Sequence, residues 1–308
     1  MRILKTVKEY GSTTISTSSE TLDTQTVKGL GDVVSYHIQT DITTVGGTGT
    51  ELADGSGYGT TGAFKGASVA RLFRRIKLSD NNNTDLAVIE KDDIWRMAYL
   101  LSLVNADDFL FNRGISSEPT TQSGDATNVV NHFIIPQSIG VADLPATLEI
   151  ELGTLSDFYS TVGSGTAVIN TLSVIVRYVP PKASAITLRI KAFNITAFSA
   201  DTDIAHLLPD GIKIHLLAYV TSNVNASSAP SEDVNTRVDR LSFRRGSNEE
   251  IENIRRTMID EYINVRYDGT RLSGLTVIPT DAFEKTDSSK FEFDVNAQIA
   301  PRIFYVYQ

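Results

Sequence analysis

Apolar and polar residues alternate with a period of two in several stretches of the chain. Leu148, Ile150 and Leu152 alternate with Glu149 and Glu151. A β-strand turns successive side chains to opposite faces, so one set can enter a core while the other faces water. The same alternation recurs in the ranges 33–44, 172–178 and 291–296. Loops rich in Gly, Ser, Asn and Thr separate these stretches, which favours antiparallel sandwiches or barrels over an α/β sheet.

Two segments have the spacing of amphipathic helices instead. The first, at 92–101, begins with two acidic residues, which suit a helix N-terminus. Its predicted apolar face comprises Ile94, Met97, Ala98 and Leu101. The second helix is predicted to begin at Ser247, because Ser247 and Glu250 have the spacing of a capping box. Its predicted apolar stripe comprises Ile251, Ile254, Met258 and Tyr262, with Arg255 and Arg256 far enough along to suit the helix dipole.

These elements follow the same order in the two halves of the chain. In the first half a strand at 33–44 leads through a glycine-rich loop to a basic strand around 75–78, a polar turn, the first helix and closing strands. In the second half a strand at 212–220 leads to a strand at 240–243, the second helix and closing strands. We therefore predict a tandem duplication. Its predicted parts are an N-terminal arm at 1–30, a first domain at 31–181 and a second at 182–308, with Pro-Pro-Lys-Ala-Ser at 180–184 as a hinge or linker.

Four segments near the ends of the two halves carry a family resemblance. They are a predicted strand pair at 133–136 and 144–152 and the closing segments 288–295 and 303–307. With one helix before the final strands, each half resembles the single jelly roll of the double jelly-roll major capsid proteins. These occur in tailless icosahedral viruses, often with an internal membrane, including tectiviruses, corticoviruses, finnlakeviruses and, more distantly, adenoviruses. The resemblance covers residues 30–308.

The resemblance implies an all-β fold of two tandem antiparallel eight-stranded jelly-roll barrels, each with a short inserted helix. It also implies a structural protein without enzymatic activity or cofactor, which forms pseudo-hexameric homotrimers that tile an icosahedral shell over an internal membrane. The expected partners are neighbouring capsomers, minor or vertex capsid proteins and the membrane lipid. The expected place is the virion of a virus such as a bacteriophage, after synthesis in the host cytoplasm.

Composition narrows the alternatives. The 308 residues carry a formal net charge of −9, which argues against a general nucleic-acid binder but leaves a local basic surface open. No sequence-specific nucleic-acid partner is expected. The chain contains no cysteine, which excludes disulfides and thiolate chemistry. No apolar run approaches the length needed to span a bilayer, and the N-terminal segment lacks the apolar core of a secretory signal.

No motif points to catalysis, a cofactor or a metal. The Gly57–Gly62 segment has dinucleotide-loop spacing, but no helix follows it. The four histidines lack the spacing of a helical metal site, although His37 and His215 fall in comparable strands. The segment 80–85 lacks the glycine and distal glutamate of a calcium loop, so a polar hairpin turn is predicted. Glu149 and Glu151 share one strand face rather than facing each other across a cleft.

Two groups of residues are candidate contact sites. The first is an apolar and basic N-terminal group, predicted to contact a membrane or a neighbouring subunit: Arg2, Ile3, Leu4 and Lys5. The second is basic, predicted to form salt bridges at a subunit interface or an inner surface facing anionic lipid or packaged genome: Arg71, Arg74, Arg75, Lys77, Arg244 and Arg245.

Two other functions compete with a capsid role. A carbohydrate- or receptor-binding β-sandwich of a viral spike or adhesin would cluster exposed aromatic residues, whereas aromatics here make up 8% and mostly alternate within strands. A jelly-roll enzyme would need a convergent acid or metal cluster, and the sequence pattern indicates none.

Overall fold

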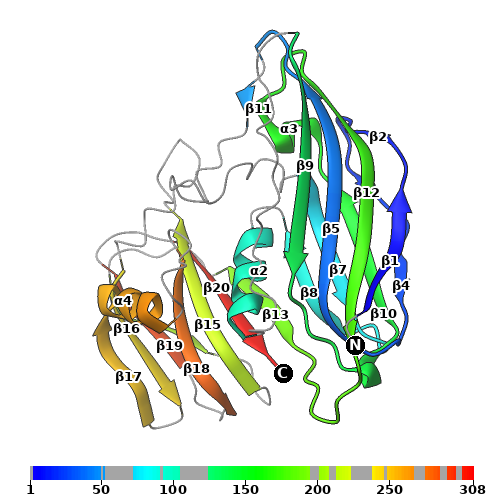
Figure 1. The fold of residues 1–308 in the computed structure, drawn as a ribbon. Coiled ribbons are helices and arrows are strands. Elements are labelled where there is room, and N and C mark those ends of the chain that lie inside the picture. The colour runs from blue at the N-terminus through cyan, green and yellow to red at the C-terminus, as the bar shows by residue number, and fades with distance from the viewer. Residues whose placement is uncertain are drawn as a thin grey trace. The chain divides into compact units, whose positions relative to one another are not determined.

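The computed structural model describes residues 3–49, 51–52, 72–90, 93–104, 124–194, 201–207, 213–222, 238–245, 248–266, 275–284, 290–295 and 300–308. These residues form two compact units, the first ending at Arg189 and the second beginning at Ile190 (Figure 1). Both units consist mainly of antiparallel strands.

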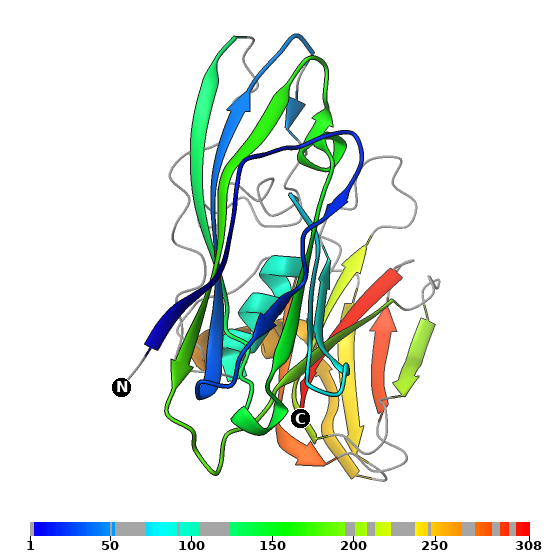
Figure 2. The ribbon, with the colours of Figure 1, turned by 90° about the vertical axis from the view of Figure 1, so that its right-hand side faces the viewer.

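Two sheets face each other in the first unit (Figure 2). One has the order β1 (Ile3–Tyr10), β12 (Thr166–Val179), β5 (Asp32–Val45) and β9 (Ala126–Ile135), with β2 (Thr13–Thr14) also on β12. The other has the order β3 (Glu20–Thr21) with β4 (Gln25–Val27), then β10 (Ala146–Leu152), β7 (Phe73–Ser79) and β8 (Asp85–Glu90). A small separate pair joins β6 (Glu51–Leu52) to β11 (Tyr159–Thr161). The helical segments are α2 (Asp93–Val104), the 3₁₀ turn η2 (Val141–Asp143) and α3 (Leu155–Phe158).

Strict alternation along the strands builds the core of the first unit. In β10 every second residue is buried, so Leu148 and Ile150 enter the core while Glu149 and Glu151 face outward. Tyr36, Phe73 and Phe133 are among the largest buried side chains of the unit, and the rings of the two phenylalanines meet edge to face at 5.4 Å. This confirms the predicted placement of the alternating residues.

The second unit repeats this arrangement. One sheet has the order β13 (Arg189–Asn194), β20 (Ala300–Tyr307), β15 (Lys213–Ser222) and β18 (Thr276–Glu284). The other has the order β14 (Asp201–Leu207), β19 (Lys290–Val295), β16 (Val238–Arg245) and β17 (Asn248–Arg255). Helix α4 (Arg256–Arg266) follows β17. Phe243 and Tyr305 are among its largest buried side chains.

Strand order is the same in both units. Counted along the chain, with β3 and β4 as one interrupted strand, the described residues of each unit form eight principal strands in the sheet orders 1-8-3-6 and 2-7-4-5. This is the jelly-roll order, in which each of two sheets alternates early and late strands. Each unit also inserts one helix, α2 or α4, between its fifth and sixth strands. The predicted double jelly roll is therefore confirmed, and β5 and β15, which carry His37 and His215, are equivalent third strands.

Two predicted elements differ from the structure. The helix predicted from Ser247 is wrong in its first part, because residues 248–255 form β17 and the helix begins only at Arg256. Pairing with β16 overrides the local capping signal, since Ile251 and Ile254 lie opposite Phe243 and Leu241 in that sheet. The predicted apolar stripe is also wrong: Met258 and Tyr262 are 63% and 53% exposed, whereas Ile259 and Asp260 are buried.

The first predicted strand pair also needs correction. The strands at 126–135 and 146–152 do not pair with each other, since β9 pairs with β5 and β10 with β7. This error comes from strand pairing between segments distant in the sequence. Within the N-terminal segment, β1 pairs along β12, and β3 and β4 pair with β10. The division into an arm at 1–30 and domains at 31–181 and 182–308 stays a prediction.

Candidate assembly surfaces

The N-terminal candidate residues lie on an edge strand. β1 is the outermost strand of its sheet, where Leu4 lies opposite Arg177 and is 65% exposed, and Lys5 is exposed beside it. Arg2 and the side chain of Ile3 lie outside the described residues. An edge strand offers backbone N–H and C=O groups for pairing with another chain. With an exposed leucine and lysine, this edge has the chemistry for a protein neighbour or a lipid surface.

Three basic candidates of the first unit, Arg74, Arg75 and Lys77, lie on β7 and are paired with carboxylates of the same chain. Arg75 Nη2 lies 2.5 Å from Glu149 Oε1, and Arg74 Nε lies 3.4 Å from Glu151 Oε1. Lys77 Nζ lies 3.0 Å from Asp85 Oδ1 on β8. The outward carboxylates of β10 therefore neutralise the arginines of the neighbouring strand. The salt bridges form within the chain, and a contact of this face with another subunit stays a prediction.

The remaining basic candidates are less fully described. Arg71 lies outside the described residues. Arg244 and Arg245 belong to β16, opposite Glu249 and Asn248 of β17, and their side chains lie outside the described part of the chain. β7 and β16 are both fourth strands of their units, so the basic residues on them occupy equivalent strands.

A pair of histidines connects β5 and β9 on the outer face of their sheet. His37 Nδ1 and His132 Nε2 lie 3.0 Å apart, and His37 Nε2 lies 3.1 Å from Ser35 Oγ. Burial, followed by the charges of His132 and Arg177, lowers the pKa of His37 to about 4, and burial also lowers the pKa of His132. The pair is therefore neutral at pH 7, when one ring can donate a hydrogen bond to the other. Sequence spacing missed this contact because the residues are 95 positions apart.

The predicted linker is fastened to the first unit. The backbone N–H of Lys182 donates to Asp32 Oδ2 at 2.7 Å, and Asp32 Oδ1 accepts from the N–H of Val141 at 2.9 Å. Further along, Ser138 Oγ donates to the carbonyl of Ile186 at 2.7 Å. Asp32 is only 3% exposed, so these bonds lie largely away from water. The chain is thus held on the first unit through most of the connection to the second.

Arg189, at the end of this connecting segment, forms an ion pair with the predicted polar turn. Its Nη2 lies 2.8 Å from Asp80 Oδ2, while Asp80 Oδ1 accepts from the N–H groups of Asn82 and Thr84, each at 2.9 Å. Asp80 is 2% exposed. The turn between β7 and β8 is therefore the polar hairpin turn that the sequence predicts, with its carboxylate already used within the protein.

Within the described ranges, no three His, Cys, Asp or Glu side chains converge as a metal site, and no helix is long and apolar enough to cross a membrane. The Gly57–Gly62 segment lies outside these ranges. What the described residues offer is a set of outward strand faces and edges on two matching barrels. Such surfaces can recognise other protein surfaces or lipid.

The chain has the fold of the double jelly-roll viral major capsid proteins. No family model and no curated protein sequence matches it. Among solved structures, it is similar to the major capsid protein of Sulfolobus turreted icosahedral virus, with 11% sequence identity, a TM-score of 0.66, and coverage of 100% of this chain and 96% of that chain.

It is also similar to the major capsid protein of bacteriophage PM2, with 11% identity and a TM-score of 0.57, over 100% of this chain and 97% of that chain. A quasi-atomic model of the PBCV-1 virus capsid gives 11% identity and a TM-score of 0.54, over 100% and 93%. Since sequence identity is this low, the likeness concerns the fold, and it extends over both barrels.

Proposed function

We propose that this chain is the major capsid protein of an icosahedral virus and acts by self-assembly, without an enzymatic step. The observation that carries the proposal is the repeated jelly roll: two barrels of identical strand order lie in one polypeptide. The likeness over nearly the whole length of solved major capsid proteins supports the same role. The protein would be made in the host cytoplasm and would reside in the shell of the virion.

The proposed building block is a homotrimer. Three copies of a tandem pair arrange six similar barrels about a three-fold axis, which approximates a hexagonal outline. One protein can then occupy the hexagonal positions of a shell without a second kind of subunit. Neighbouring capsomers and minor or vertex capsid proteins are the proposed partners.

We further propose that the edge strand β1 contacts a neighbouring subunit or an internal membrane. The exposed Leu4 and Lys5 support this, with Arg2 and Ile3 as the adjoining candidates. The proposed inner or interfacial basic surface comprises Arg71, Arg74, Arg75, Lys77, Arg244 and Arg245. Because Arg74, Arg75 and Lys77 already have carboxylate partners, they support a subunit interface better than a general polyanion site.

Native mass spectrometry of the purified chain, over a range of concentrations, tests the trimer. The expected species has three times the 33.6 kDa mass of one chain. A persistent monomer that binds a glycan would contradict the proposal and support the competing carbohydrate-binding function.

A pair of leucine variants tests the role of β1. Leu4→Glu places a charge on the exposed edge strand, whereas Leu30→Glu places the same charge at another exposed leucine, 48% accessible, in the same unit. A neighbour contact predicts fewer assembled particles for Leu4→Glu alone. A membrane contact predicts reduced co-sedimentation of Leu4→Glu with anionic vesicles. Equal behaviour of the two variants in both assays would contradict a role for β1.

A further inference from the structure

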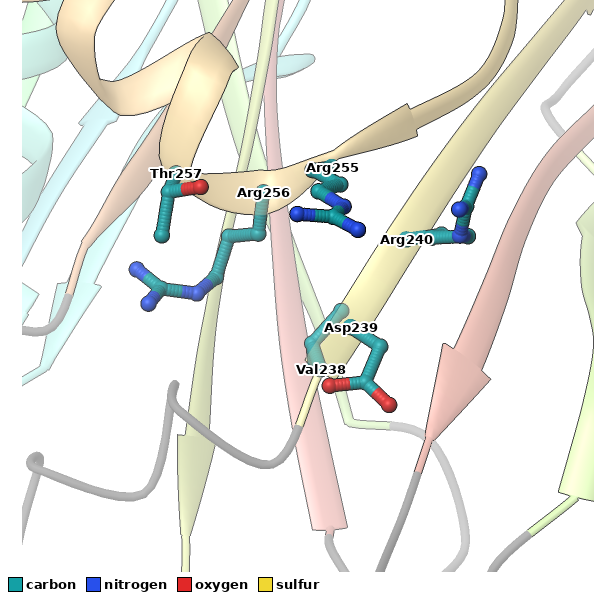
Figure 3. A pocket seen from close by; sticks show the side chains of 6 residues that line it. All are labelled: Val238, Asp239, Arg240, Arg255, Arg256 and Thr257. Atoms are coloured by element: carbon teal, nitrogen blue, oxygen red, sulfur yellow. The ribbon is translucent and has the colours of Figure 1, made fainter.

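Strand pairing in the second unit gathers three arginines around one pocket. Arg240 on β16 lies directly opposite Arg255 on β17, and Arg256 is the first residue of α4. The pocket has a volume of about 420 Å³ (Figure 3). It is lined by Val238, Asp239, Arg240, Arg255, Arg256 and Thr257.

This arrangement is electrostatically unfavourable for the protein alone. Like charges directly opposite each other on neighbouring strands repel. A cation at the beginning of a helix opposes the helix dipole, whose positive end lies there, and α4 has no acidic residue in its first turn. Three features that each favour a negative charge therefore coincide at one place: the Arg240–Arg255 pair, Arg256 and the N-terminus of α4.

Acidic residues also lie near these arginines. Asp260 pairs with Arg256 Nη1 and also accepts a hydrogen bond from Thr276 Oγ1 at 3.1 Å, so both of its oxygens are engaged. Asp239 lines the pocket, and Figure 3 shows it on the opposite side from Arg255 and Arg256. Arg240 lies opposite Asp294 of β19 in the strand register.

Arg255 and Arg256 can each donate further hydrogen bonds at the pocket. Within the described residues, the exposed guanidinium of Arg255 forms no ion pair. The Nε of Arg256 is buried, and no acceptor for it is present in the described part of the protein. A buried N–H without an acceptor is energetically costly. Binding of a ligand that supplies an oxygen atom here would therefore be favourable.

We infer that this pocket binds a phosphate-class oxyanion between Arg255, Arg256 and the first turn of α4. Guanidinium groups match phosphate oxygens in geometry and charge, and the free N–H groups of a helix N-terminus add further donors. Arg240 supports the site by its charge, and Asp239 limits its affinity. The inference does not depend on the capsid proposal, since it concerns the second unit by itself.

Calorimetric titration of the full chain with pyrophosphate in low-salt, phosphate-free buffer tests the site. The parent is expected to bind one pyrophosphate per chain, and Arg255→Gln to weaken binding about tenfold. Asp239→Asn removes a carboxylate from the lining and is expected to tighten binding about threefold. Lys191→Gln is the matched control: it removes one positive charge from an exposed position of the same unit and leaves affinity unchanged.

Thermal denaturation without ligand separates binding from folding. Because Arg255→Gln relieves the repulsion with Arg240, this variant is expected to be at least as stable as the parent in phosphate-free buffer, while its stabilisation by pyrophosphate is reduced. Absence of saturable binding by the parent overturns the inference. Equal weakening by Arg255→Gln and Lys191→Gln also overturns it, because binding would then reflect net charge alone.

Vesicle experiments identify the source of the phosphate. The site is assigned to a lipid headgroup if the parent is captured by phosphatidylcholine vesicles that contain phosphatidic acid. This capture must be lost in Arg255→Gln and absent with vesicles of phosphatidylcholine alone. Pyrophosphate binding without vesicle capture assigns it to a free phosphate compound.

Discussion

Replacement of Asp80 by alanine is expected to lower the free energy of unfolding of the first unit by about 3–4 kcal/mol. The carboxylate is 2% exposed and accepts hydrogen bonds from two backbone N–H groups, each contributing about 1 kcal/mol. The substitution also removes the carboxylate that pairs with Arg189. Because Arg189 is 21% exposed, solvent screening reduces that part to about 1–2 kcal/mol.

Asparagine at the same position separates the two contributions. Asp80→Asn keeps an oxygen for the amides of Asn82 and Thr84 but removes the charge that faces Arg189, so the expected loss is about 1–2 kcal/mol. Urea denaturation followed by tryptophan fluorescence measures both variants. The only tryptophan, Trp95, belongs to α2 of the first unit, so the signal follows that unit.

Asp125→Ala, at an exposed acid of the same unit, is the control and is expected to change stability by less than about 0.5 kcal/mol. The pH dependence gives a second check. Burial raises the pKa of Asp80, but hydrogen bonds from Arg189, Thr84 and Asn82 outweigh it and hold the pKa below its ordinary value. The contribution of Asp80 is therefore present above the ordinary carboxyl pKa and is lost as pH falls through the folded-state pKa. A loss below about 1 kcal/mol for Asp80→Ala, or equal losses for both Asp80 variants, would refute this reasoning.

Three further predictions concern the first unit. Since the pKa of His37 is lowered to about 4, the free energy of unfolding should fall by about 1–2 kcal/mol, after allowance for solvent, as pH decreases from about 6.5 to about 4. Urea titrations should show a weaker dependence of stability on pH for His37→Gln, and the same dependence in both proteins would contradict the assignment. Gly31→Ala should lower the melting temperature, because a Cβ on Gly31, which has φ +155°, would lie 2.3 Å from the Val179 carbonyl oxygen. Gly11→Ala, at a position with open space around it, should have little effect, and similar shifts for the two variants would argue against the clash. Phe133→Ala should lower the free energy of unfolding by about 3–4 kcal/mol in urea denaturation, whereas Val130→Ala should lower it by less than about 1 kcal/mol, because Val130 on the same strand is 37% exposed. A small loss for Phe133→Ala would mean that its site is not tightly packed.

Local patterns in the sequence predicted the faces of individual elements well. Each pattern reports which side of one strand or helix faces a core. The alternation at 146–152 and the helical spacing at 94–101 are two examples, and the structure buries Leu148, Ile150, Ile94 and Met97 as expected. These two successes share a cause: the information lies within a few residues, where periodicity reports which side faces the core. The repeated order of elements predicted a tandem duplication, and the family resemblance implied the double jelly roll.

Features that depend on strand register were missed. The helix signal at Ser247 is local, whereas β17 owes its conformation to pairing with β16. The contact of His37 with His132 and the opposition of Arg240 and Arg255 likewise arise only when separate strands align. The ion pairs between β7 and β10 were missed for the same reason, because no periodicity in the sequence specifies register across strands.

Electron microscopy of the assembled protein tests the central claim most directly, because it counts the barrels contributed by each chain. Averaged images of the native assembly are expected to show six barrels around a three-fold axis with a hexagonal outline, two from each of three chains. Assemblies with one barrel per chain, or with a symmetry that excludes a three-fold axis, would contradict the account.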